Sequence, residues 1–132
     1  MLINELKSKI TKKNITDFVN LWQDYHDYLL SLKKKEITKK ECITISRKFK
    51  DACLPVHENL CRKIKEHPDK EQRILKCPFY KLCNHSNQMK GHRNYCEIAG
   101  NARDFNFEKV KKLLKEVNDD SLNELKNIEE SW

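Results

Sequence analysis

The chain has 132 residues, a formal net charge of +7, six cysteines and only two glycines. This length fits one domain, or one small core with a satellite module. Two glycines are too few for a P-loop or a Rossmann-type turn, and they argue against a turn-rich β-sandwich or barrel. We expect no membrane span and no signal peptide, because no long apolar run is present. The cysteines of such an intracellular protein, nuclear or cytoplasmic, are expected to bind metal or fill the core.

The positive charge is concentrated in the middle of the chain. Residues 1–32 are neutral, 33–60 carry +4, 61–103 carry +6 and 104–132 carry −3. A basic middle favours contact with a polyanion. The alternative is a solvated lysine surface, since a high content of Lys, Asn and Ile is what AT-rich coding produces.

The N-terminal third predicts helices. Residues 2–10 fit a short helix, and residues 16–33 fit a longer one in which Thr16 caps the first turn. His26 lies beside the apolar face of this helix, and we expect it at the helix surface or at the edge of the core. That face comprises Phe18, Val19, Trp22, Tyr25, Leu29 and Leu32.

A second helix is expected after a lysine-rich turn. Thr38 and Glu41 have the spacing of a capping box. Pro55 is expected to break or kink this helix, and a further helical stretch over 56–64 ends near Pro68. The predicted core face of the second helix contains Cys42, Ile45, Phe49 and Cys53.

Helices are also expected in the C-terminal third. We place Gly100 just beyond the end of a helix that begins inside the cysteine-rich segment. Ser121 and Glu124 have the spacing of a second capping box, which predicts a terminal helix. The apolar face before this box comprises Phe107, Val110, Leu113, Leu114 and Val117, and that of the terminal helix Leu122, Leu125 and Ile128.

The strongest chemical signal is the pattern C-x5-C-x8-H-x3-C formed by Cys77, Cys83, His92 and Cys96. A structural Zn²⁺ takes four thiolate or imidazole ligands in a tetrahedron. His92 and Cys96 share one face of a helix, while a short loop lets Cys77 and Cys83 fold over the same ion. We therefore expect one structural Zn²⁺. The side chains expected to pack around it are Phe79, Leu82, Met89 and Tyr95.

Two alternatives stay open at this motif. His85 can replace Cys83 as the second ligand, or the residues can be core side chains without metal. A module this small has little apolar material of its own, whereas structural zinc contributes about 10–16 kcal/mol to folding. This comparison favours the metal.

The motif resembles the small CHHC-type zinc fingers found in a minor-spliceosome protein, a tRNA methyltransferase and gametocyte-specific factors. Cys77-Pro78-Phe79 matches their opening, and His92 to Cys96 matches their H-x3-C closure. The chain departs from them at Cys83, where the family has His, and its middle spacer is one residue shorter. The resemblance covers residues 77–96 only. It implies zinc coordination and, as a further expectation, binding to structured RNA.

The surface of the finger favours a nucleic-acid partner. Residues 76–96 contain no acidic group, and Tyr80 can stack on unpaired bases. In the alternative, Tyr80 packs inside the finger and the lysines only keep it soluble. The candidate contacts are Lys63, Lys76, Tyr80, Lys81, Lys90 and Arg93.

A weaker constellation is formed by Cys42, Cys53, His57 and Cys61, in the pattern C-x10-C-x3-H-x3-C. It would be a second zinc site if the helix runs through Pro55, but we favour a core role because cysteine is often buried. No catalytic arrangement is evident from spacing. Four protein ligands would also leave zinc no open position, so we expect no enzyme activity.

The sequence thus predicts an all-α fold, a small helical bundle with one embedded C2HC-type zinc finger. The expected parts are a helical region (1–68), a zinc-finger module (69–103) and a C-terminal helical hairpin (104–132). The favoured function is a zinc-dependent adaptor that binds nucleic acid, RNA before DNA, within a larger complex. A second hypothesis is a protein-interaction module that docks a partner or a second copy through helices 14–33 and 105–130. A third is a viral or parasite effector that suppresses RNA-based host defence.

Overall fold

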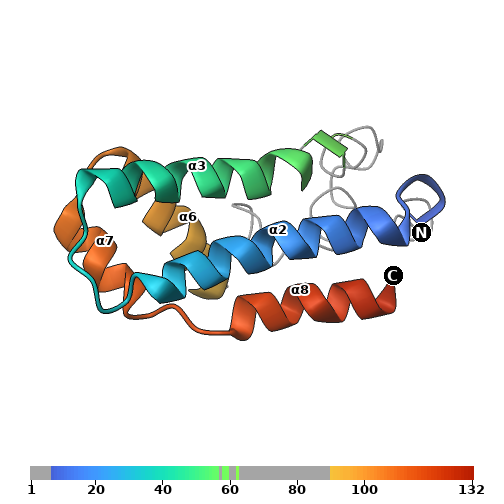
Figure 1. Ribbon diagram of the computed structural model, residues 1–132. Helices are drawn as coiled ribbons and strands as arrows, with labels where there is room; N and C mark the ends of the chain where they lie inside the picture. Colours follow the sequence, from blue (N-terminus) through green and yellow to red (C-terminus); the bar gives the residue numbers. More distant parts are fainter. Residues whose placement is uncertain (1–6, 57, 60–61, 63–89) are drawn as a thin grey trace.

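The computed structural model describes residues 7–56, 58–59, 62 and 90–132, and these residues form helices and turns without a strand. The all-α prediction is therefore confirmed for this part of the chain. None of its helices is long and apolar enough to cross a membrane. The main helices are α2 (Lys12–Ser31), α3 (Lys39–Val56), α6 (Lys90–Arg103), α7 (Phe107–Leu114) and α8 (Asp120–Ser131) (Figure 1).

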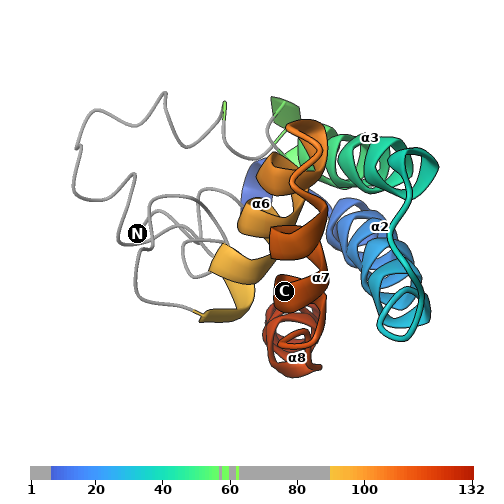
Figure 2. The same ribbon diagram turned by 90° about the vertical axis from the view of Figure 1, so that its left-hand side faces the viewer.

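The helices pack against one another as a bundle. Helix α2 contacts α3 and α8 and runs antiparallel to both (Figure 1). In the turned view, α6 and α7 lie beside the pair of α2 and α3, and α8 lies below α7 (Figure 2). Helix α6 packs against α3 and α7. The domain boundaries at 68 and 103 stay a prediction.

Helix α2 begins earlier than predicted, because its N-cap is Thr11 and not Thr16. The Thr11 hydroxyl accepts a hydrogen bond from the Asn14 backbone N–H at 3.2 Å, and the Asn14 side chain accepts one from the Thr11 N–H at 3.2 Å. This is a capping box with Asn in place of the usual Glu or Gln, which explains why the pattern was missed. The predicted core face is buried throughout.

Helix α3 begins as predicted. The Glu41 side chain accepts from the Thr38 N–H at 3.1 Å, and the Thr38 hydroxyl accepts from the Glu41 N–H at 3.4 Å. The helix passes through Pro55 and its described part ends one residue later. A proline in the last turn removes a single helical hydrogen bond, so it does not end the helix before itself. Cys42 and Ile45 are buried, while the remaining two residues of the predicted face, Phe49 and Cys53, are half-buried.

The predicted end of α6 at Gly100 is wrong, because the helix continues to Arg103. Phe105 is the residue just beyond the end of α6, at the C′ position where glycine is most common, and its φ is 57°. Two backbone hydrogen bonds define this Schellman motif: Phe105 N–H donates to the Ala102 carbonyl at 3.1 Å, and Asn106 N–H to the Asn101 carbonyl at 2.9 Å. Ala102 is fully buried, so core packing extends the helix past Gly100. A side chain in this left-handed conformation costs about 1–2 kcal/mol.

The second predicted capping box is also wrong. Helix α8 begins at Asp120, with Asp119 as its N-cap, so position 121 already lies inside the helix. The Asp119 side chain makes no capping hydrogen bond. Its carboxylate instead accepts from the ring of His26 at 2.9 Å. The Asp119 carboxylate, which could cap the first turn of α8, is thus used in a contact with α2.

An aromatic cluster fills the centre of the bundle. Trp22 lies 5.8 Å from Phe49 and 5.5 Å from Tyr95, ring centroid to ring centroid, and Tyr25 lies 5.6 Å from Tyr95. Tyr95 was expected beside the metal, but it is 2% exposed and packs in this core. Phe107 was expected in the core, but it is 40% exposed.

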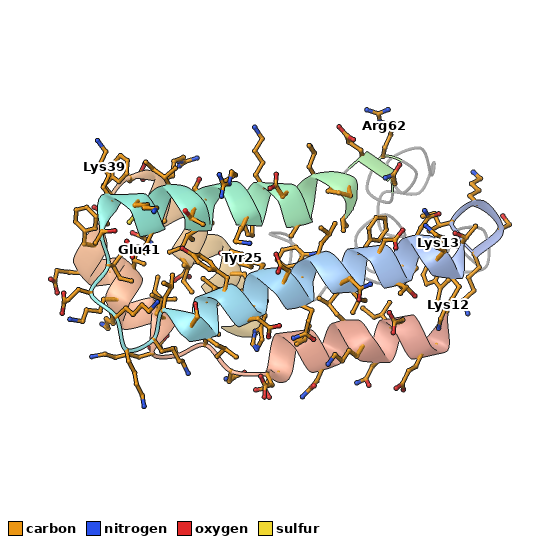
Figure 3. All side chains as sticks on the ribbon, in the orientation of Figure 1. Lys12, Lys13, Tyr25, Lys39, Glu41 and Arg62 are labelled. Carbon is orange, nitrogen blue, oxygen red and sulfur yellow. The ribbon has the colours of Figure 1, made fainter. Side chains whose placement is uncertain are left out.

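The end of α8 is held against the start of α2. The Trp132 indole N–H donates to the Ile10 carbonyl at 3.0 Å, and the Lys12 ammonium donates to the Glu129 carbonyl. Lys12 lies at this end of the bundle, and Lys39 lies at the opposite end (Figure 3). The first and last described segments are therefore in contact.

Candidate metal centre and the buried histidine beside it

The structure describes half of the predicted zinc motif. His92 and Cys96 fall on α6, four residues apart, as the spacing predicts. Cys77 and Cys83 lie outside the described residues, as does the alternative ligand His85. Among the described residues, no group of three or more His, Cys, Asp and Glu could hold a metal ion. The zinc centre therefore stays a prediction.

Helix α6 carries the two ligand positions beside its core-facing side. Tyr95, Ile98, Ala99 and Ala102 are buried and define the side that faces the bundle. At 100° per residue, position 92 lies about 20° and position 96 about 60° around the helix from Ala99. Both ligand positions therefore adjoin one flank of the buried side.

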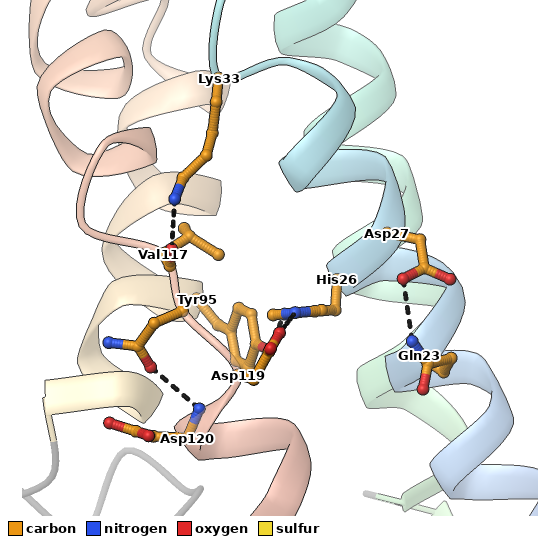
Figure 4. A network of polar contacts seen from close by, with 9 residues as sticks. Gln23, His26, Asp27, Lys33, Tyr95, Val117, Asp119 and Asp120 are labelled. Atoms are coloured by element: carbon orange, nitrogen blue, oxygen red, sulfur yellow. Dashed lines mark hydrogen bonds and ion pairs between the residues drawn. The ribbon is translucent and has the colours of Figure 1, made fainter.

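A buried histidine connects three elements next to this flank. His26 on α2 is 1% exposed. Its Nδ1 lies 2.7 Å from the Tyr95 hydroxyl on α6, and its Nε2 lies 2.9 Å from a carboxylate oxygen of Asp119, at the start of α8 (Figure 4). The expectation of a surface or core-edge histidine is wrong.

The partners of His26 determine its tautomer. An ionised carboxylate only accepts hydrogen bonds, so Nε2 carries the proton and donates to Asp119. In the neutral ring, Nδ1 is then an acceptor, and the Tyr95 hydroxyl donates to it. Both ring nitrogens are therefore satisfied although the ring is buried. A buried polar group costs stability unless it is paired in this way.

The three side chains have the order of a nucleophile, a base and an orienting carboxylate, but the geometry supports a structural role. Burial, with the nearby Asp119 and Asp27 carboxylates, raises the pKa of Tyr95 above its usual 10.0. A nucleophile needs the opposite shift and access to substrate. Tyr95 is 2% exposed, so substrate has no access to its hydroxyl.

The second cysteine constellation does not assemble on α3. Cys42 and Cys53 are eleven residues apart on one continuous helix, a rise of about 16 Å, which is too far for one ion. Cys42 is fully buried, and burial raises the pKa of its thiol, with a smaller contribution from Glu41. The core interpretation is confirmed for Cys42. His57 and Cys61 lie outside the described residues.

The predicted nucleic-acid contacts fall mostly outside the described part of the chain. This holds for Lys63, Lys76, Tyr80 and Lys81. Lys90 and Arg93 are backbone positions in the first turn of α6. The N-terminal end of a helix carries a partial positive charge, which adds to the attraction of these positions for phosphate.

The helices expected to dock a partner use their apolar faces inside the protein. The α2 face packs on α3 and α8, and Val110, Leu113 and Leu114 of α7 are buried. Tyr28 and Trp132 are half-buried against the core. The buried apolar faces of α2 and α7 are therefore not available to a partner in this structure.

The sequence did not reveal the His26–Tyr95–Asp119 network. Its members are 69 and 93 residues apart in the chain, and no local pattern joins them. The only signal was a histidine next to an otherwise apolar helix face. No protein-family model, curated protein or solved structure matches this chain.

Proposed function

We propose that this protein is a small zinc-dependent adaptor that binds nucleic acid, RNA before DNA, and acts within a larger complex. The observation that carries the proposal is the position of His92 and Cys96, one turn apart on the same helix, α6. With Cys77 and Cys83 they would complete the four ligands of one structural Zn²⁺.

The charge of the same region supports the nucleic-acid part of the proposal. Residues 76–96 contain no acidic group, and 61–103 carry a net charge of +6. A polyanion is attracted to such a surface mainly through its phosphates, and binding then weakens as salt rises. The preference for RNA comes from the resemblance to the CHHC-type fingers.

Native mass spectrometry tests the metal. We expect one Zn²⁺ per chain, and we expect Cys83→Ser or His92→Ala to lose it. Cys53→Ser is the matched control, because Cys53 is half-buried and is not one of the four residues of the motif, and this variant should retain the ion. A chain that binds no zinc would refute the proposal, and two ions would require a second site.

A salt titration of RNA binding tests the partner. Charge reversal of Lys81, Lys90 and Arg93 should weaken binding and lower the slope of log affinity against log salt by about 2. Reversal of three exposed lysines elsewhere changes the net charge equally and should have a smaller effect; Lys13, Lys50 and Lys126 serve for this. Affinity that is independent of salt would refute the proposal.

The form of the bound RNA separates the remaining hypotheses. Tight binding of short duplexes without sequence preference would support an effector of RNA-based defence. A stable dimer or partner complex without any shift on RNA would support the protein-interaction module. Light scattering with and without RNA provides this measurement.

A further inference from the structure

The turn between α6 and α7 exposes two phenylalanine rings. Phe105 is 39% exposed and Phe107 is 40% exposed. Their ring centroids are 6.4 Å apart, and the ring planes are tilted by 37°. Neither ring is part of the core, so the two form an aromatic surface at one end of the bundle.

The backbone at this surface is strained for the side chain it holds. Phe105 has φ 57°, a conformation that favours glycine. Burial does not explain a phenylalanine here, because the ring is substantially exposed. Strain that is retained at an exposed position indicates a functional use of the side chain.

Positive charge surrounds the rings. The Lys39 ammonium lies 5.4 Å from the centroid of the Phe105 ring. Residues 38–43 and 103–112 together contain six Lys or Arg and three Asp or Glu. Two of these basic groups pair with acids: Arg103 lies 3.6 Å from Asp104, and Lys111 lies 2.9 Å from Glu36. The positive charge at the rings therefore comes mainly from the other four basic residues, Lys39, Lys40, Lys109 and Lys112.

Two helices also begin at this surface. Helix α3 begins at Lys39 and helix α7 at Phe107, so their partially positive ends lie at the same end of the bundle (Figure 1). The N-cap of α7, Asn106, makes no capping hydrogen bond and instead donates to the Asn101 side chain. The field at the rings is therefore positive from both side chains and backbone.

We propose that Phe105 and Phe107 form a stacking platform for unpaired bases of single-stranded nucleic acid, with Lys39 and its neighbouring lysines facing the phosphates. This inference rests on the proposed function and deepens it, because it names the form of the partner. Aromatic rings stack on any base, and lysines follow the backbone. Two other partners fit this surface less well. A second copy of the chain would place its lysines against these lysines. An uncharged helix would bury the lysines without an opposite charge to pair with them.

Binding of a labelled oligouridine tests the platform by fluorescence anisotropy. The single strand is about 12 nucleotides long, and a duplex of the same length is the comparison. Phe105→Gly removes one ring and relieves the backbone, and Phe107→Ala removes the other exposed ring. Leu54→Ala is the matched control, because Leu54 is 43% exposed at the opposite end of α3.

We expect each phenylalanine variant to bind the single strand about tenfold more weakly, with little change for the duplex and none for Leu54→Ala. Unchanged single-strand binding by both phenylalanine variants, in a protein that still loses affinity on charge reversal of Lys81 and Lys90, overturns the platform alone. Equal losses for single strand and duplex also overturn it, as does a dimer that Phe107→Ala abolishes. Failure of the wild-type chain to bind any RNA overturns the proposed function as well.

Discussion

Removal of the Tyr95 hydroxyl is the sharpest test of the buried network. In Tyr95→Phe the ring remains in the aromatic cluster, but the donor 2.7 Å from His26 Nδ1 is lost. The nitrogen then stays in a site that is 1% exposed, without the donor that satisfied it. Leaving a buried polar atom unpaired costs about 1–3 kcal/mol, and we expect a loss in this range.

The assay is urea unfolding followed by tryptophan fluorescence, since Trp22 lies 5.5 Å from Tyr95 in the same cluster. The midpoint should fall while the slope against urea stays constant, because the buried surface is the same. Asp119→Asn is the control: Asn still accepts from His26 Nε2, and the Asp119 side chain is 72% exposed, so the loss should stay below about 1 kcal/mol.

Nitrogen NMR of His26 adds a direct readout. In the neutral wild-type ring the proton should be on Nε2, with Nδ1 accepting from Tyr95. The reasoning is refuted if Tyr95→Phe unfolds at the wild-type midpoint, if Asp119→Asn costs more than Tyr95→Phe, or if Nδ1 carries the proton in the neutral ring.

Three further predictions concern the helix ends and the cysteines. Thr11→Ala should destabilise the protein by about 1 kcal/mol through loss of the N-cap, whereas Thr16→Ala should cost less than half of that in the same urea series. Phe105→Gly should be about 1 kcal/mol more stable than Phe105→Ala, because only the alanine keeps a Cβ at φ 57°; equal midpoints would contradict the strain. Iodoacetamide should label Cys53 well before Cys42, whose thiol is buried with a raised pKa, and peptide mass spectrometry would expose the reverse order.

The helices and much of the core could be predicted from spacing alone. The α2 face, the α3 capping box and the buried residues of α7 depend on residues within one or two turns of each other. Period and capping are local properties, so one sequence reveals them.

The errors arise where a distant contact overrides a local rule. Asp119 interacts with His26 and not with the end of its own helix, and the buried Ala102 carries α6 beyond Gly100. The sequence places Tyr95 among the metal ligands that flank it, but its side of the helix faces the bundle. The zinc ligands and the nucleic-acid contacts stay predictions, since most of them lie outside the described residues.

The position of α8 against α2 has a consequence for how fast the chain folds. Trp132 and Ile10 are 122 residues apart in sequence, and His26 and Asp119 are 93 apart, yet each pair is in contact. Proteins whose contacts join distant parts of the chain fold more slowly than those with local contacts, because loop closure comes before the stabilising contacts. We therefore expect this protein to fold more slowly than helical bundles built from neighbouring hairpins, with the α2–α3 hairpin formed before α8 docks.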